Sequence, residues 1–192
     1  DLERLAFQDP LTGLANRRTL DEHAEKYLAL AERRGTLVGL IYLDLTRFKT
    51  INDRHGHAAG DAVLTEVARR LEAMARTGDL VGRVGGDEFV VVLPDLEDRD
   101  AAVTVARRMV NGLEEAPVEL EDARTTVRAE TGIAVYPEHG GSLEEIIRAA
   151  DQAMYRAKKS NGDVEPREVA GDRAAAAVTA TGDRPSPNRA EH

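Results

Sequence analysis

The chain contains no cysteine, few aromatic residues and no long hydrophobic run. Aromatic residues make up only 4% of its 192 residues. The lack of cysteine excludes disulfides and thiolate metal sites, and it fits a reducing compartment. No apolar run approaches the length needed to cross a membrane, and the sequence has no signal peptide. We therefore expect a soluble, cytoplasmic protein.

Positive charge is also scarce, since 26 lysines and arginines face 35 acidic residues and leave a net charge of -9. This balance argues against a general nucleic-acid binder. It does not exclude an anionic nucleotide as ligand, because bound Mg²⁺ can supply local positive charge. The chain starts at Asp1 without an initiator methionine. We expect a piece of a longer protein, with a sensor or a membrane anchor upstream.

Hydrophobic patterning predicts an α/β fold in a single domain with additional terminal segments. Residues 1–8 have the spacing of the end of an incoming helix, and 9–162 contain the predicted domain. Residues 163–192 hold almost no large apolar side chains, so we expect them to be disordered. Within the domain, the pattern predicts helices at 17–34, 61–76, 99–115 and 143–159, a helical turn at 46–52, and strands at 37–44, 80–84, 89–93 and 126–135.

The most informative stretch is Gly85-Gly86-Asp87-Glu88-Phe89, which lies between two predicted strands of a hairpin. Its two glycines allow a tight turn and a close approach of the backbone to a ligand. The two acids that follow place paired carboxylates on this turn. Such an arrangement suits divalent metal and phosphate chemistry.

A second acid, Asp44, closes the continuous apolar strand predicted at 37–44. An acid at the carboxyl end of a buried strand often faces a ligand. Close to Asp87 in space, it would complete a two-carboxylate Mg²⁺ site. The alternative is that Asp44 merely caps the helical turn that follows.

Asn52 and Asp61 flank a loop and could converge on a nucleotide base. A carboxylate accepts hydrogen bonds from the N1-H and N2 amino donors of guanine, and an asparagine donates to O6 or N7. Alternatively, Asp61 is the N-cap of the helix predicted at 61–76. His55 and His57 lie in the same loop, where two histidines are more often solvated or packed than metal-bound.

Two further motifs are weak by themselves. Arg76-Thr77-Gly78-Asp79 joins a helix end to a strand, and a basic residue followed by a glycine is a common helix terminus. Lys158 could contact a phosphate, although a lysine near the end of a helix is usually a solvated charge.

Together these segments resemble the GGDEF domain of bacterial diguanylate cyclases, from residue 9 to about 162. The resemblance implies a fold like the nucleotidyl cyclase or polymerase palm, with a central five-stranded mixed sheet surrounded by helices. It is carried by Asp9-Pro10-Leu11-Thr12-Gly13-Leu14-Ala15-Asn16-Arg17-Arg18, Phe48-Lys49-Thr50-Ile51-Asn52-Asp53, Gly56-His57, Gly60-Asp61, residues 83–89 and Ala150-Asp151 to Lys158.

The resemblance also implies an activity in second-messenger signalling. Two GTP molecules condense to cyclic di-GMP and two pyrophosphates across a homodimer, controlled by an upstream sensor and by the product. By motif, the metal (Mg²⁺, with Mn²⁺ as the alternative) is held by Asp44, Asp87, Glu88 and the Leu45 carbonyl. Glu88 can also assist deprotonation. The implied contacts to GTP come from Phe48, Lys49, Asn52, Asp61 and Lys158, and those to inhibitory cyclic di-GMP from Arg76 and Asp79.

Two positions depart from the family pattern. Thr46 stands where a second acid is usual, and Ser160-Asn161-Gly162 replaces a glycine, arginine and asparagine whose arginine contacts phosphate. These changes leave a second reading open, a regulatory module that binds GTP or cyclic di-GMP with little or no catalysis. A cyclase making a different cyclic nucleotide is a third reading, which Asp61 disfavours.

Overall fold

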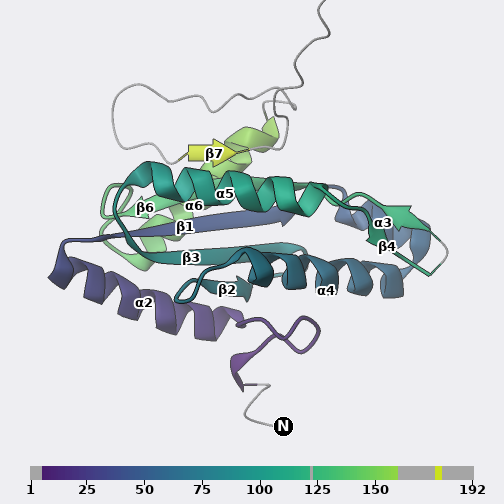
Figure 1. The fold of residues 1–192 in the computed structure, drawn as a ribbon, viewed down its shortest axis with the longest axis horizontal. Coiled ribbons are helices and arrows are strands. Elements are labelled where there is room, and N and C mark those ends of the chain that lie inside the picture. The colour runs from purple at the N-terminus through teal and green to yellow at the C-terminus, as the bar shows by residue number, and fades with distance from the viewer. Residues whose placement is uncertain (1–5, 122, 160–175, 179–192) are drawn as a thin grey trace, which may run out of the picture.

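A single antiparallel sheet flanked by helices on both faces forms the centre of the computed structural model (Figure 1). The structure describes residues 6–121, 123–159 and 176–178. The five strands lie in the order β2-β3-β1-β6-β7, and β4 and β5 form a separate two-stranded sheet. The bounds are α2 Arg17–Arg34, β1 Leu37–Leu45, α3 Phe48–His55, α4 His57–Met74, β2 Leu80–Arg83, β3 Glu88–Leu96, α5 Arg99–Glu114, β4 Val118–Glu119, β5 Arg124–Thr125, β6 Ala129–Tyr136, α6 Leu143–Lys159 and β7 Ala176–Val178.

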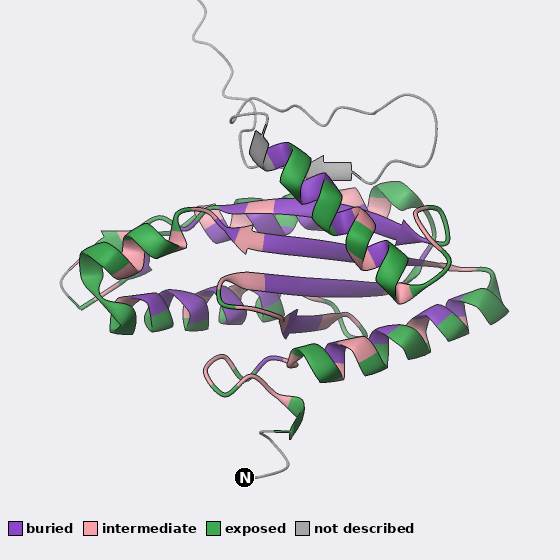
Figure 2. Cartoon of the chain, turned by 180° about the vertical axis from the view of Figure 1, so that it is seen from behind, coloured by how far each residue is buried: buried purple, intermediate pink, exposed green. Residues whose placement is uncertain are grey.

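Strand β1 is the middle of the core, as its continuous apolar run predicts. Its alternating side chains enter two different clusters: Ile41 and Leu43 pack towards α4 and α5, whereas Leu40 and Tyr42 pack towards α2 and α6. Figure 2 shows the buried central strands and the exposed outer faces of the helices. Burial on both faces explains why this strand lacks the polar alternation of a surface strand.

The α/β fold class is confirmed, but the sheet is not mixed as expected. All four pairings between its named strands are antiparallel. The physical reason is the hairpin, which inserts β3 between β1 and β2. Strands β1 and β2 run in the same direction, yet they are never hydrogen-bonded neighbours.

Helix starts differ from the sequence prediction at the α3–α4 connection. Helix α4 begins at His57, so Asp61 lies inside it, and the alternative that Asp61 is the N-cap is wrong. The loop expected around His55 and His57 consists of Gly56 alone, whose φ of 85° favours glycine. Helix α3 has Arg47 as its N-cap residue, without a capping side chain, so the capping alternative for Asp44 is also wrong.

The N-terminal loop covers the edge of the sheet. The Ala15 amide donates to the Val81 carbonyl at 3.3 Å, and the Arg83 amide donates to the Ala15 carbonyl at 2.9 Å. Asp9 pairs with the Arg83 guanidinium at 3.0 Å and accepts hydrogen bonds from the amide and hydroxyl of Thr12. This loop therefore protects the exposed edge of β2 from pairing with other chains.

Parts of the expected terminal segments lie outside the described residues. Residues 6 and 7 are helical, and 1–5 are not described. Of the tail expected to be disordered, only residues 176–178 are described, and they form β7 along β6. In the described part of the chain, no helix is both long and apolar enough to cross a membrane.

The Asp9–Arg83 pair makes a stability prediction. Burial raises the pKa of Asp9, but hydrogen bonds from Thr12 and Arg83 outweigh burial and hold this pKa below its ordinary value. Both side chains are largely buried, 14% exposed for Arg83 and 17% for Asp9. Asp9→Asn should therefore lower the free energy of unfolding at pH 7 by about 2 kcal/mol, measured by urea denaturation.

The effect should depend on pH in a defined direction. A carboxyl whose folded-state pKa is lowered contributes fully above its unfolded-state pKa of about 3.9, and its contribution is lost as the pH falls through the folded-state value. The difference in the free energy of unfolding between wild type and Asp9→Asn should therefore be smaller at pH 3 than at pH 7. Glu32→Gln, an exposed acid on α2, is the control and should change neither quantity. An equal gap at both pH values would contradict the assignment.

Candidate active site

Three carboxylates form a row across the end of the sheet. Asp44 on β1 lies directly opposite Glu88 on β3 and, on its other side, directly opposite Glu130 on β6. Directly opposite residues of an antiparallel sheet share a face, with Cβ atoms about 5 Å apart. Asp44 lies two residues from Tyr42, so the row is on the face covered by α2 and α6. The row is partly exposed.

Asp87 joins this row through the backbone. The Leu45 amide donates to the Asp87 carbonyl at 3.1 Å, which ties the glycine turn to the residue after Asp44. Burial and then the negative charges of Asp44 and Asp87 raise the pKa of Glu88. Asp44, Asp87 and Glu88, proposed from separate parts of the sequence, thus lie at one end of the sheet.

The carboxylates and the Leu45 carbonyl at this end of the sheet are oxygen ligands of the type that Mg²⁺ prefers. In the described part of the chain, no three acids or histidines are grouped as a ready-made metal cage. Mg²⁺ rarely needs such a cage, since it usually takes one or two carboxylates and completes its shell with water and substrate phosphates. The metal assignment to Asp44, Leu45, Asp87 and Glu88 stays a prediction.

Arg83 positions the glycine turn. Its guanidinium donates to the Gly86 carbonyl from Nε at 3.2 Å and from a terminal nitrogen at 2.7 Å, while it pairs with Asp9. A Cβ at Gly85 would come within 2.5 Å of a Glu88 carboxylate oxygen, so a larger residue here would displace the Glu88 side chain. The N-terminal loop therefore holds the turn that carries Asp87.

Sequence reasoning did not assign roles to Asp9, Arg83 or Glu130. Arg83 stands in the 83–89 segment that carries the family resemblance. Its partners, Gly86 and Asp9, lie 3 and 74 residues away along the chain. Glu130 is a charged residue inside the strand predicted at 126–135, which was an available signal. Its position beside Asp44 depends on strand register.

The two predicted base-reading residues lie on consecutive helices, Asn52 on α3 and Asp61 on α4. A Cβ at Gly60 would overlap Oδ1 of Asn52, so the Asn52 carboxamide lies against the backbone immediately before Asp61. The Phe48 ring lies against the same position, because a Cβ added at Gly60 would be 3.1 Å from its Cζ atom. Asp61 and Lys49 are exposed. Lys158 lies in α6, but its side chain is outside the described residues.

Arg76 and Asp79 are paired with each other in a separate cavity of about 540 Å³. Asp79 accepts from the Arg76 backbone amide at 2.9 Å and from its Nε at 3.0 Å, and Arg76 also donates to the Pro94 carbonyl at 2.6 Å. The Asp79 side chain is 1% exposed, whereas that of Arg76 is 55% exposed. Only the arginine is readily available to a ligand.

Comparison with known proteins agrees with this arrangement. The family model described as diguanylate cyclase, GGDEF domain matches residues 6–163. Diguanylate cyclase TpbB of Pseudomonas aeruginosa is 40% identical over 159 residues, which are 82% of this chain and 36% of that protein. The chain thus spans about a third of that relative's length.

Solved structures match over most of the described domain. A sensory box/GGDEF family protein from Caulobacter crescentus has a TM-score of 0.77 and 39% identity, covering 80% of this chain and 99% of that one. The GGDEF domain of DgcB from Caulobacter crescentus, solved in complex with c-di-GMP, has a TM-score of 0.75 and 29% identity, covering 81% and 92%. By sequence, by fold and by the glycine turn with its acids, this chain belongs to the diguanylate cyclase GGDEF domain family.

Proposed function

We propose that this domain condenses two GTP molecules into cyclic di-GMP and two pyrophosphates, as one half of a homodimer. The observation that carries the proposal is the convergence of Asp44, Asp87 and Glu88 at one end of the sheet. The names of the relatives TpbB and DgcP, both diguanylate cyclases, support it.

The reaction forms one P–O bond for every P–O bond that it breaks. The 3′-hydroxyl of each GTP attacks the α-phosphorus of the other, and pyrophosphate leaves in line with the attack. A metal ion held by Asp44, Asp87 and the Leu45 carbonyl would neutralise phosphate charge and acidify the attacking hydroxyl. Glu88 would assist metal binding or accept the hydroxyl proton.

The remaining residues would bind and orient GTP. Asn52 and Asp61 would read the guanine edge, and the contact of the Asn52 carboxamide with the Gly60 position, next to Asp61 in the chain, supports this assignment. Lys49 and Lys158 would contact phosphates, with help from backbone amides around Phe48. Because each half-site holds one nucleotide, the two domains must face each other for the hydroxyl to reach its target.

Product formation from GTP and Mg²⁺ tests the proposal. The chain fused to a dimeric coiled coil should release cyclic di-GMP and pyrophosphate in a 1:2 ratio, measured by mass spectrometry and a pyrophosphate assay. Asp87→Asn should lower the rate roughly 100-fold or more, because it removes charge at the reacting phosphates. Glu32→Gln should not change the rate.

Two results would decide against this reading. A dimer that binds GTP but forms no product would favour the regulatory module, to which Thr46 also points. An unchanged rate in Asp87→Asn, with circular dichroism confirming the fold, would refute the metal assignment.

Base selectivity is a separate prediction. Asp61→Ala should weaken GTP binding about 10-fold, because a charge-assisted hydrogen bond to guanine is lost at an exposed position. ATP, which lacks the N1-H and N2 donors, should bind weakly to both proteins. Asp53→Ala, an exposed acid beside Asn52, is the matched control for calorimetric titration. Equal losses in the two variants would argue against a base contact.

We also propose product inhibition through Arg76 and Asp79. Arg76→Ala should abolish inhibition by cyclic di-GMP and reduce its bound stoichiometry, because the exposed guanidinium would no longer pair with phosphate. Asp79 is left intact in this test, since its carboxylate accepts from the Arg76 amide. Arg69→Ala, an exposed arginine on α4, is the control. Unchanged stoichiometry in Arg76→Ala would place the inhibitory site elsewhere.

A further inference from the structure

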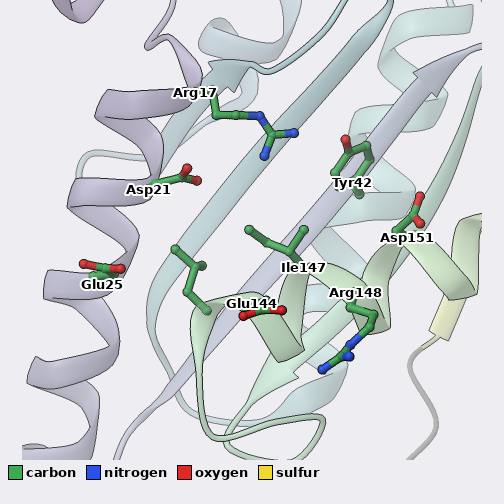
Figure 3. Close-up of a pocket in the computed structure, with 9 residues that line it drawn as sticks. Arg17, Asp21, Glu25, Tyr42, Glu144, Ile147, Arg148 and Asp151 are labelled. Carbon is green, nitrogen blue, oxygen red and sulfur yellow. The ribbon is translucent and has the colours of Figure 1, made fainter.

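A second cavity, of about 550 Å³, lies between α2, β1 and α6 (Figure 3). Arg17, Asp21 and Glu25 line it from one face of α2, at a spacing of four residues. Tyr42 lines it from β1. The residues assigned to metal, to guanine and to the inhibitory site are absent from its lining. Its volume is typical of small-molecule sites.

The charge of the lining favours a cation. Four acids and two arginines line the cavity, namely Asp21, Glu25, Glu144 and Asp151 with Arg17 and Arg148. Figure 3 shows the Asp21 and Glu144 side chains between the two helices, reaching the cavity from opposite sides. Acids on both walls give the space a net negative charge that a small cation would neutralise.

Asp21 supplies an independent observation. One of its carboxylate oxygens is buried and has no hydrogen-bond partner among the described residues. Burial also raises the pKa of Asp21. A buried acceptor without a partner is costly, and a ligand that donates a hydrogen bond would satisfy it.

The rest of the lining is apolar. Leu143 and Ile147 enter from α6, and the Tyr42 ring lies on the β1 side. These surfaces would cover a short alkyl or aromatic body, while Asp21 would bind a charged donor. A bare metal ion would leave the apolar wall unused.

We propose that the cavity between α2 and α6 binds a small organic cation, with an ammonium or guanidinium group on a compact apolar body. Asp21 accepts a hydrogen bond from the charged group, and Leu143 and Ile147 pack against the apolar part. The class includes primary amines and guanidino compounds of about ten non-hydrogen atoms, a size that the cavity accommodates.

The cavity is connected to the row of acids through Tyr42. Tyr42 lies two residues before Asp44 on β1, on the same face of the sheet as Glu88. The Tyr42 hydroxyl and the positive charge of Arg17 both act to lower the pKa of Glu88, against the burial that raises it. Tyr42 and Arg17 line the cavity as well. A cation bound in the cavity would therefore lie next to Tyr42 and Arg17, the residues that also act on Glu88. This regulatory consequence rests on the proposed cyclase function, whereas binding itself does not.

Calorimetric titration of the whole chain with phenethylamine, without nucleotide, tests the site. We expect saturable 1:1 binding, at least 10-fold tighter than that of 2-phenylethanol, which has the same body without the charge. Asp21→Asn should weaken phenethylamine binding at least 10-fold, and Glu144→Gln should also weaken it. Glu22→Gln is the matched control, since this acid is adjacent on α2 but exposed and paired with Arg18.

Several results would overturn the proposal. These are the absence of saturable binding up to millimolar phenethylamine, equal binding of 2-phenylethanol, or wild-type affinity in Asp21→Asn. Failure of cyclic di-GMP synthesis would leave the binding result intact, so the two proposals fail separately.

The connection to Glu88 has its own readout. In backbone amide NMR spectra, saturating phenethylamine should shift the Tyr42 and Glu88 signals in the wild type. In Tyr42→Phe, which removes the hydroxyl but keeps the ring, binding should persist while the Glu88 shift is lost. A Glu88 signal that does not move in the wild type would overturn the regulatory part.

Discussion

The pairing of β1 with β3 is the constraint on which the rest of the structure depends. It places Leu43 opposite Phe89 in the core and Asp44 opposite Glu88 at the end of the sheet. Since side chains alternate between the faces, a slip of one residue would turn the core residues of β3 to the wrong face. The apolar residues on both faces of β1 therefore hold the acids in place.

This register brings like charges together, and the surrounding structure accommodates them. Carboxylates whose Cβ atoms lie about 5 Å apart repel each other, and the charges of Asp44 and Asp87 help to raise the pKa of Glu88. Arg83 holds the turn through Gly86 and Asp9. Tyr42 and Arg17 act to lower the pKa of Glu88. A cation among these acids would relieve the remaining repulsion.

The two cavities described above lie apart from the row of acids and at different places on the fold. One contains Arg76 and Asp79, where α4 leads into β2. The other lies between α2 and α6 and shares Tyr42 with the surroundings of Glu88. Both lie against helix α2 or the loop before it, since Thr19 lines the first and Arg17 the second. The N-terminal part of the domain is therefore common to both.

The sequence by itself determined the α/β class, the bounds of α2 and α6, the buried character of β1, and the glycine turn with its two acids. These depend on local periodicity, capping and turn chemistry, which a short window contains. The antiparallel sheet, the place of Glu130 beside Asp44, the Asp9–Arg83–Gly86 connection and the cavity over Tyr42 were decided only by tertiary structure. Each of them joins residues far apart in the chain, and strand order, register and helix packing bring those residues together.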